Sequence, residues 1–117
     1  MRSKREIIIE AYSGFNRRDI DAVLELMHPY VDWPNGMEGG YVHGRDEVRA
    51  YWSRQWGVID PRVDPLEIDD GVDGNTVVHV HQVVRHLSGA VLVDQMVRHV
   101  YSIRDGLIER MTIEDAE

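Results

Sequence analysis

The sequence predicts an α+β fold in which a curved antiparallel β-sheet wraps around three N-terminal helices to form a cone. In the first half, apolar residues recur at intervals of three and four, which indicates amphipathic helices. After Pro65 the pattern becomes β-branched, which indicates strands. Turn residues at Ser88-Gly89 and Asp105-Gly106 join these strands into a meander. Because 117 residues suit one hydrophobic core, we expect residues 1–117 to form a single domain.

Two short helices are expected before Pro29. Their apolar stripes are formed by Ile8, Ala11, Tyr12 and Phe15 in the first helix and by Ile20, Val23, Leu24 and Met27 in the second. Asp19 can cap the second helix, because its carboxylate can accept a hydrogen bond from a free backbone N–H group. We expect this helix to close at His28, because a proline disfavours the α conformation in the residue before it.

The third helix is expected to begin near Arg45. Residues 30–33 precede it as a short extended segment, and residues 35–44 form a polar, glycine-rich loop. Asp46 and Glu47 suit the positive end of the helix dipole. One face of this helix carries Val48, Tyr51, Trp52 and Gln55, and Trp56 shares much of that stripe.

Long strands are expected over residues 76–87, 91–104 and 107–113, after an extended stretch that contains two prolines. The last strand has two possible registers, because Asp-Gly turns often include a bulge that shifts the pairing by one residue. The residues that face inward are then either Glu109 and Met111 or Arg110 and Thr112.

The register of the long hairpin assigns its two faces. With a two-residue turn at Ser88-Gly89, Val91 pairs with His86 and His99 pairs with Val78, and directly opposed residues share a face. The more apolar face then consists of Val78, Val80, Gln82, Val84, His86, Val91, Val93, Gln95, Val97, His99 and Tyr101. The other face carries His79, His81, Val83, Arg85, Asp94, Met96 and Arg98.

The helices are expected to cover the more apolar face, because burying the other face would leave ionised groups without water. Gln82, Gln95, His99 and Tyr101 therefore point into the cone. A turn one residue longer would exchange the two faces and place charged groups such as Arg85 in the core, so we prefer the shorter turn.

Composition narrows the classes of partner. Twenty-one acidic against thirteen basic residues give a formal net charge of -8, which disfavours binding to nucleic acid. The chain contains no cysteine, which fits a cytoplasmic location and excludes thiolate chemistry. We see no apolar run of the roughly 18 residues that a membrane span needs, and no signal peptide.

The inward-facing groups suggest a binding site for a small hydrophobic molecule. His99 can transfer a proton near neutral pH or donate a hydrogen bond to a carbonyl oxygen. Asp32 is a candidate partner carboxylate for His99 or a base. The candidate ligand-binding residues are Phe15, Trp33, Trp52, Trp56, Gln82, Gln95, Val97 and Tyr101, because aromatic rings with a few amides suit a flat, partly polar ligand.

The outer face of the sheet suggests a different use. His79 and His81 have a spacing that can chelate a metal, but no carboxylate stands at the usual third-ligand spacing. We therefore expect no metal site, and we interpret this face, with Val83 and Met96 among its charged groups, as a homodimer interface.

Three motifs carry a resemblance to a known family: "RRDIDAVLELMHPYVDW", "GRDEVRAYW" and "IRDGLI". With the order of the elements, they make the chain similar to the SnoaL-like polyketide cyclase group of the nuclear transport factor 2-like superfamily. The resemblance implies the cone fold, a dimer through the sheet and a pocket that works without a cofactor. Family members include isomerases, cyclases, dehydratases, epoxide hydrolases and non-catalytic binders.

The resemblance extends to ketosteroid isomerases, whose general-base aspartate stands immediately before the proline that ends the first strand. Trp33 occupies that position here, and Asp32 is one residue away. The oxyanion-hole tyrosine of those enzymes aligns with Ala11, next to Tyr12, and their second oxyanion-hole acid falls on His99. The resemblance thus implies His99 as the acid-base or oxyanion-stabilising group, assisted by Asp32 or Tyr12.

Two functions follow from these patterns. The first is a cofactor-independent enzyme that performs acid-base chemistry on a hydrophobic carbonyl-containing or polycyclic substrate. The second is a non-catalytic binding or assembly domain of the same fold, suggested by the missing base before Pro34.

Overall fold

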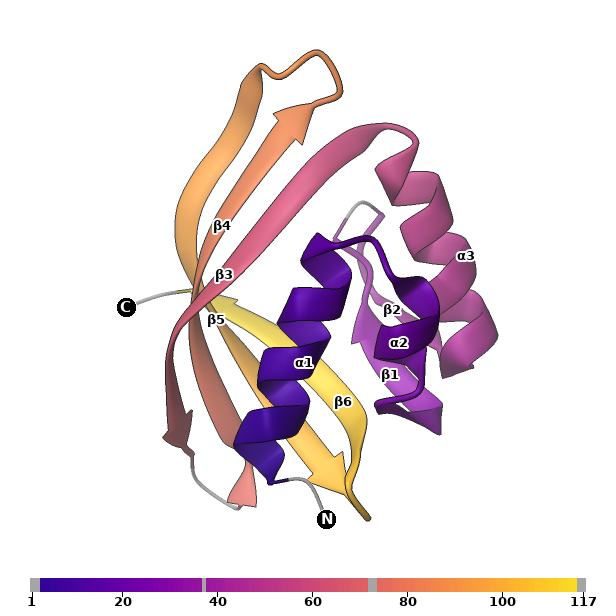
Figure 1. Cartoon of the computed structure of the whole chain (residues 1–117), viewed down its shortest axis with the longest axis vertical. Helices are drawn as coiled ribbons and strands as arrows, with labels where there is room; N and C mark the ends of the chain where they lie inside the picture. Colours follow the sequence, from indigo (N-terminus) through magenta and orange to yellow (C-terminus); the bar gives the residue numbers. More distant parts are fainter. Residues whose placement is uncertain (1–2, 37, 72–73, 116–117) are drawn as a thin grey trace.

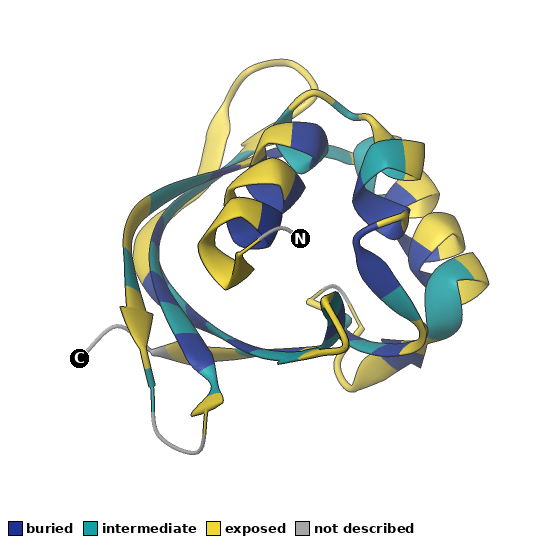
Figure 2. Cartoon of the chain, turned by 60° about the horizontal axis from the view of Figure 1, so that its bottom comes forward, coloured by how far each residue is buried: buried dark blue, intermediate teal, exposed yellow. Residues whose placement is uncertain are grey.

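The computed structural model describes residues 3–36, 38–71 and 74–115, and in them a curved sheet wraps around the helices (Figures 1 and 2). In chain order the elements are α1 (Lys4–Asn16), α2 (Ile20–Leu24), β1 (Met27–Pro34), β2 (Tyr41–His43), α3 (Gly44–Trp56), β3 (Ile59–Asp70), β4 (Thr76–His86), β5 (Val91–Arg104) and β6 (Leu107–Asp115). The six strands form one sheet in the order β2-β1-β6-β5-β4-β3. The predicted cone is confirmed, although β1 and β6 run parallel in a sheet that is otherwise antiparallel. None of the helices in these described ranges is long and apolar enough to cross a membrane.

The first two helices begin at side-chain caps. Ser3 Oγ accepts a hydrogen bond from Glu6 N at 3.1 Å, and Ser3 N donates to Glu6 Oε1 at 3.2 Å, which forms a capping box. Asp19 caps α2 as predicted, because its Oδ1 accepts from Ala22 N at 3.2 Å. These caps satisfy backbone N–H groups that have no partner inside their helices.

Pairing with β6 shortens α2 relative to the prediction. The helix ends at Leu24, and the segment expected to complete it enters β1 at Met27. Leu26 O accepts from Ile108 N at 2.8 Å, and Met27 lies opposite Ile108 in the parallel pair. The predicted end at His28 was therefore wrong, because tertiary strand pairing overrides the local helical pattern. The predicted loop over residues 35–44 also contains a short strand, β2, which pairs with β1.

The long hairpin reaches the predicted register through two compensating irregularities. Gly89 N donates to His86 O and His86 N donates to Ala90 O, both at 2.8 Å, so the turn has one residue more than predicted. Gly89 has a φ of 102°, which favours glycine in this kind of turn. Val91 pairs with Arg85 rather than with His86, and β5 holds an extra residue before the next pair. This β-bulge at Leu92 cancels the extra turn residue.

Beyond that bulge the predicted pairs are confirmed. Gln95 lies opposite Gln82, and His99 lies opposite Val78. His99 is buried under the helices, whereas Arg85 and Asp94 are exposed. The predicted faces are therefore correct from Val93 to Tyr101, whereas Val91 shares the face of Arg85 instead of that of His86, and the predicted two-residue turn is wrong.

The last strand matches the first of its two predicted registers at Met111 but not at Glu109, whose carboxylate accepts from Ser102 Oγ at 3.3 Å outside the cavity. Met111 is buried and lies opposite Tyr101. Ser102 pairs with Arg110 and Ile103 with Ile108, so β6 has a bulge at Glu109. This bulge allows Ile108 and Met111 to be buried together although they are three residues apart.

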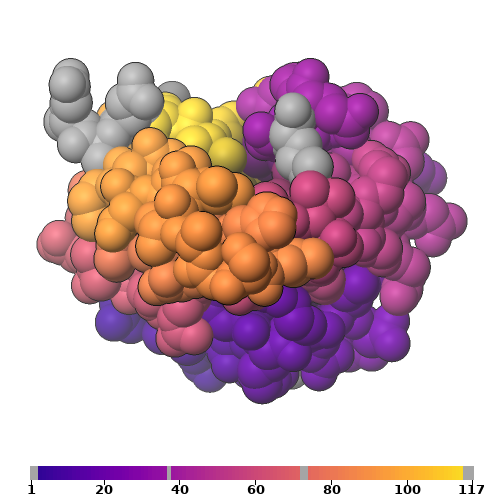
Figure 3. Space-filling model, turned by 90° about the horizontal axis from the view of Figure 1, so that it is seen from above, coloured from indigo at the N-terminus to yellow at the C-terminus, as the bar shows by residue number. Residues whose placement is uncertain are grey.

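A side-chain amide fastens α1 to the edge strand β3. Asn16 Nδ2 donates to Val63 O at 2.7 Å, and Val63 N donates to Asn16 Oδ1 at 3.0 Å. The amide therefore pairs with the backbone as a neighbouring strand would. At the opposite end of the molecule from the N-terminus, the β4–β5 hairpin projects beside the segment that joins α3 to β3 (Figures 1 and 3).

Candidate functional site

A cavity lies between the helices and the concave face of the sheet. The volume open to the centre of a water-sized sphere is about 90 Å³. A single water needs about 10–15 Å³ on this measure, so the cavity has room for a small organic molecule. Its lining is largely apolar and comes from α1, α2, α3 and every strand except β2.

Three buried side chains form a hydrogen-bonded chain in the cavity wall. Tyr101 OH donates to Tyr12 OH at 2.9 Å, and Tyr12 OH lies 2.7 Å from His99 Nδ1. Because the Tyr12 oxygen accepts from Tyr101, its own proton is free to go to Nδ1, which assigns the His99 proton to Nε2. The Nε2 atom has no hydrogen-bond partner among the described residues. It is therefore available to donate to a ligand.

Burial keeps this chain uncharged. Loss of water lowers the pKa of His99 to about 4, so its imidazole is neutral at pH 7. Burial, with Tyr101 beside it, raises the pKa of Tyr12 well above its ordinary value. Burial likewise raises the pKa of Tyr101, against a smaller opposite effect of its hydrogen bond to Tyr12. All three groups consequently act as neutral hydrogen-bonding groups near neutral pH.

Aromatic rings form much of the remaining wall. Trp52 meets Trp33 edge to face at 5.5 Å between centroids, and Phe15 meets Trp52 in the same way at 5.3 Å. Tyr12 and the His99 ring stack at 5.8 Å with an angle of 11° between their planes. Such contacts are the arrangements that aromatic pairs prefer, and they give the cavity flat apolar surfaces.

The structure brings most of the predicted site residues to the cavity. Those that line it are Tyr12, Phe15, Trp33, Trp52, Gln82, His99 and Tyr101. Trp56 packs behind the wall on Trp52 and Phe15, and Val97 is buried in the core away from the cavity. Gln95 is exposed, because the helices do not extend over its part of the hairpin, and it contacts the site only through Gln82 Oε1 at 3.0 Å. Gln95 therefore lies on the predicted face of the sheet but outside the cavity.

Asp32 lies on the opposite side of β1 from the cavity. Neighbouring strand residues point to opposite faces, and Trp33 takes the inward position. The Asp32 carboxylate pairs with His43 and, at 3.3 Å, with Arg110. It is not brought to His99, so the structure does not support Asp32 as a partner or base for that residue.

Sequence reasoning missed a second polar region of the cavity. Tyr51 and Gln55 line it from successive turns of α3, and Gly36 lines it from the segment after β1. Gln55 Nε2 donates to Tyr51 OH at 3.1 Å, and Gly36 N donates to the same oxygen at 3.0 Å. The sequence did contain a signal for this region, because Tyr51 and Gln55 both belong to the face predicted for the third helix.

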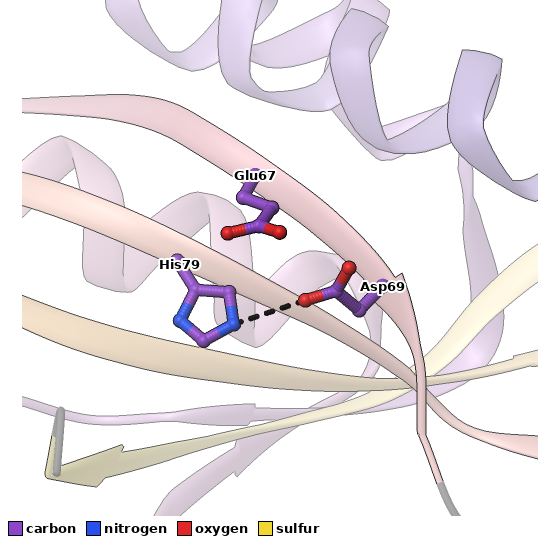
Figure 4. Close-up of side chains that lie close together, drawn as sticks. All are labelled: Glu67, Asp69 and His79. Atoms are coloured by element: carbon purple, nitrogen blue, oxygen red, sulfur yellow. Dashed lines mark hydrogen bonds and ion pairs between the residues drawn. The ribbon is translucent and has the colours of Figure 1, made fainter.

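The two outer histidines do not act as a pair. His79 Nε2 lies 3.2 Å from Asp69 Oδ2 on β3, with Glu67 beside them (Figure 4). His81 Nε2 lies 2.7 Å from Asp94 Oδ1 on β5. The carboxylates beside these histidines thus come from neighbouring strands and not from nearby positions in the sequence. Asp69 pairs with His79, and Asp94 pairs with His81.

Comparisons with known proteins identify the family of this fold. The SnoaL-like domain family matches residues 8–111. The crystal structure of TerC co-crystallised with polyporic acid is 31% identical, with 93% of this chain and 88% of that chain covered and a TM-score of 0.81. An NTF2-like protein of unknown function from Burkholderia pseudomallei is 28% identical, with 98% and 92% covered and a TM-score of 0.83. A candidate polyketide cyclase from Sinorhizobium meliloti shares the fold at 20% identity, with 92% and 93% covered and a TM-score of 0.78.

No curated protein matches the sequence. The family match spans most of the chain, and it agrees with the predicted resemblance and with the observed cone. The chain therefore belongs to the SnoaL-like domain family, with the fold of the nuclear transport factor 2-like proteins.

Proposed function

We propose that the cavity binds a small hydrophobic carbonyl or polycyclic compound and that the protein is a cofactor-independent acid-base catalyst. Isomerisation, cyclisation, dehydration and hydrolysis all belong to this class of chemistry. The observation that carries the proposal is the buried Tyr101–Tyr12–His99 chain in the wall of an apolar cavity. Polar groups placed this way can stabilise charge that develops on a substrate oxygen.

In the proposed reaction, His99 Nε2–H donates to the carbonyl oxygen of the substrate. When a water molecule removes a proton from the neighbouring carbon and passes it to solvent, negative charge moves to the carbonyl oxygen and strengthens the hydrogen bond. Tyr12 then donates more strongly to Nδ1, and Tyr101 supports Tyr12, because linked hydrogen bonds polarise one another. A neutral imidazole suits this role, since it needs no counter-ion in an apolar site.

The similarity to TerC supports a small-molecule ligand. That protein is 31% identical and was crystallised with polyporic acid, and the shared fold covers most of both chains. We infer that the corresponding space in this chain, with its aromatic walls, takes a ligand of comparable hydrophobic character.

A second function, binding without catalysis, is favoured by one specific observation. Among the described residues that line the cavity there is no aspartate or glutamate. A carboxylate is the usual base for removing a proton from carbon near a carbonyl group. Without one, the same cavity would serve to hold or carry a ligand.

Hydrogen-deuterium exchange of a ketone distinguishes these functions. We would incubate 2-tetralone in deuterated buffer with the protein and follow loss of its α-proton signals by NMR, while calorimetry measures affinity. A catalyst accelerates the exchange, and His99→Gln and Tyr12→Phe abolish the acceleration, whereas the control Tyr30→Phe retains it because Tyr30 is 82% exposed. Binding without accelerated exchange selects the second function. If neither 2-tetralone nor polyporic acid binds, both functions are refuted.

We further propose that two copies of the chain associate through the outer face of the sheet, in the cytoplasm. Met96 is exposed on this face between two polar pairs, His81–Asp94 and Arg98–Glu114. A face that combines apolar and oppositely charged groups can complement a second copy of itself. Light scattering tests this: wild type should have the mass of a dimer and Met96→Lys that of a monomer, whereas a monomeric wild type would refute it.

A further inference from the structure

The concave face of the sheet extends past the helices on the β4–β5 hairpin. Three side chains of this face lie there, and we call them the shelf: Val84, Val93 and Gln95. Val93 is 37% exposed, Gln95 is exposed and Val84 is half-buried. Val84 lies opposite Val93 and Gln82 lies opposite Gln95, so all four side chains share one face. Because Gln82 also lines the cavity, the shelf and the cavity belong to the same face of the sheet.

An apolar row joins the cavity wall to the shelf. Pro61 of β3 is buried, lines the cavity and lies opposite Val84, which in turn lies opposite Val93. Neighbouring strands are about 4.8 Å apart, so Val84 stands one strand away from the wall and Val93 stands two. No side chain in this row of three is polar or charged. The wall of the cavity therefore continues into an exposed apolar surface.

The cavity opens on the side of the shelf. Ile113 and Gln82 line the cavity, yet Ile113 is 45% exposed and Gln82 is half-buried, so both also meet solvent. Gln82 stands between the wall and the shelf, and its amide is hydrogen-bonded to that of Gln95 at 3.0 Å. The hairpin forms part of the rim of the cone, beside the segment that joins α3 to β3 (Figure 3). A ligand in the cavity can therefore extend onto the shelf.

We propose that the shelf is an outer binding subsite, which holds an apolar ring of an elongated ligand whose carbonyl-bearing part lies in the cavity. This inference rests on the proposed function, in which His99 binds the carbonyl oxygen. It adds a requirement for length. The cavity takes the reacting part of the ligand, and the shelf favours ligands that carry a further ring beyond it.

The place and the chemistry of the shelf favour the ligand as its occupant. Two copies of the chain are proposed to meet through the outer face of the sheet, which leaves the concave face to the ligand. Val84 and Val93 present methyl groups only, so a carboxylate or an ammonium group would lose hydration on them without gaining a partner. An uncharged ring loses no such hydration, and its contact with the two valines removes apolar surface from water.

The expected gain in affinity follows from the area that such a contact covers. A ring on the shelf hides one of its faces and leaves the other in solvent, so the contact is worth less than full burial of a phenylalanine side chain. We expect a ligand with the added ring to bind about 5- to 30-fold more tightly than the same ligand without it.

The test compares 2-tetralone with its isomeric phenyl derivatives by calorimetry. For at least one isomer, wild type should show the expected gain. Val93→Asp places a carboxylate under the added ring, so the gain should fall to about two-fold or less, while affinity for 2-tetralone stays within about two-fold of wild type. Val91→Asp is the matched control and should keep the gain, because Val91 is 52% exposed on the same strand but lies opposite Arg85 on the outer face.

The outcomes separate this inference from the proposed function. If 2-tetralone binds but no phenyl isomer binds more tightly, or if Val93→Asp keeps the gain, the shelf is not a subsite and the proposed function stands. If wild type binds no tetralone, the inference is overturned, and binding of polyporic acid decides the proposed function. If Val93→Asp lowers the mass of the protein in light scattering, a second copy covers the shelf and the inference is wrong. Thermal unfolding verifies that each variant is folded, and Val93→Ser, which should also reduce the gain, replaces Val93→Asp if that variant is not.

Discussion

The mutation Tyr12→Phe tests whether the buried hydroxyl chain is intact in the folded protein. The substitution removes one oxygen and keeps the ring, so packing against His99 and Tyr101 is preserved. It leaves two buried groups without their partners, His99 Nδ1 and Tyr101 OH. Each buried group that loses its partner costs about 1–3 kcal/mol. Because a hydroxyl can rotate in search of another acceptor, we expect a total loss of about 2–4 kcal/mol in the free energy of unfolding.

Urea denaturation followed by circular dichroism measures this loss, and thermal unfolding provides a second measure. For a domain of this size, about 3–6 °C of Tm is lost per kcal/mol, so the midpoint should fall by about 6–24 °C. Tyr30→Phe removes an exposed hydroxyl and should change stability by less than about 0.5 kcal/mol. If Tyr12→Phe were as stable as this control, the hydrogen-bonded chain described above would not exist in solution.

Three further predictions concern pH, packing and the far side of the first strand. The pKa of His99 is lowered from 6.5 in the unfolded chain to about 4 in the fold, so the unfolded state binds more protons between these values. As pH falls from 6.5 to 4, wild type should therefore lose about 3 kcal/mol more stability than the His99→Gln variant loses. If denaturation curves gave the same pH dependence for both proteins, the lowered pKa would be contradicted. Gly14→Ala should lower the free energy of unfolding by about 1–3 kcal/mol, because a Cβ at Gly14 would lie 2.6 Å from Val23 Cγ2. The neighbouring control Ser13→Ala should cost far less. If the two variants had comparable Tm values, α1 and α2 would be less closely packed than described. Asp32→Asn should leave ligand affinity within about two-fold of wild type by calorimetry, since the carboxylate faces away from the cavity, and a larger change would mean that it reaches the site.

The sequence was sufficient to predict the fold and the face on which His99 lies. Alternation along β4 and β5 placed charged groups such as Arg85 and Asp94 on one side, and burying them would have left ions without water. That argument does not depend on the turn, so it gave the correct faces beyond the bulge even though the turn was predicted with too few residues. The bulge at Leu92 could not be predicted, because nothing local distinguishes it from its apolar neighbours.

The candidate site was predicted less completely, for reasons that are tertiary. Asp32 was chosen for its proximity in sequence to an expected position, but strand alternation turns it away from the cavity. Gln95 has the predicted direction, yet the helices do not extend far enough to cover it.

The paired irregularities of the β4–β5 hairpin have a consequence for changes in chain length. Deleting Leu92 would remove the bulge and deleting Gly89 would shorten the loop, and in each case Val84 would stay opposite Val93 and His99 would stay in the cone. Deleting both would shorten the loop and straighten the strand while leaving the pairing next to the cavity unchanged. Related genes, and laboratory libraries, should therefore tolerate gaps at these two positions and reject a gap among the regular pairs from Val93 to Val97, which would turn His99 to the opposite face.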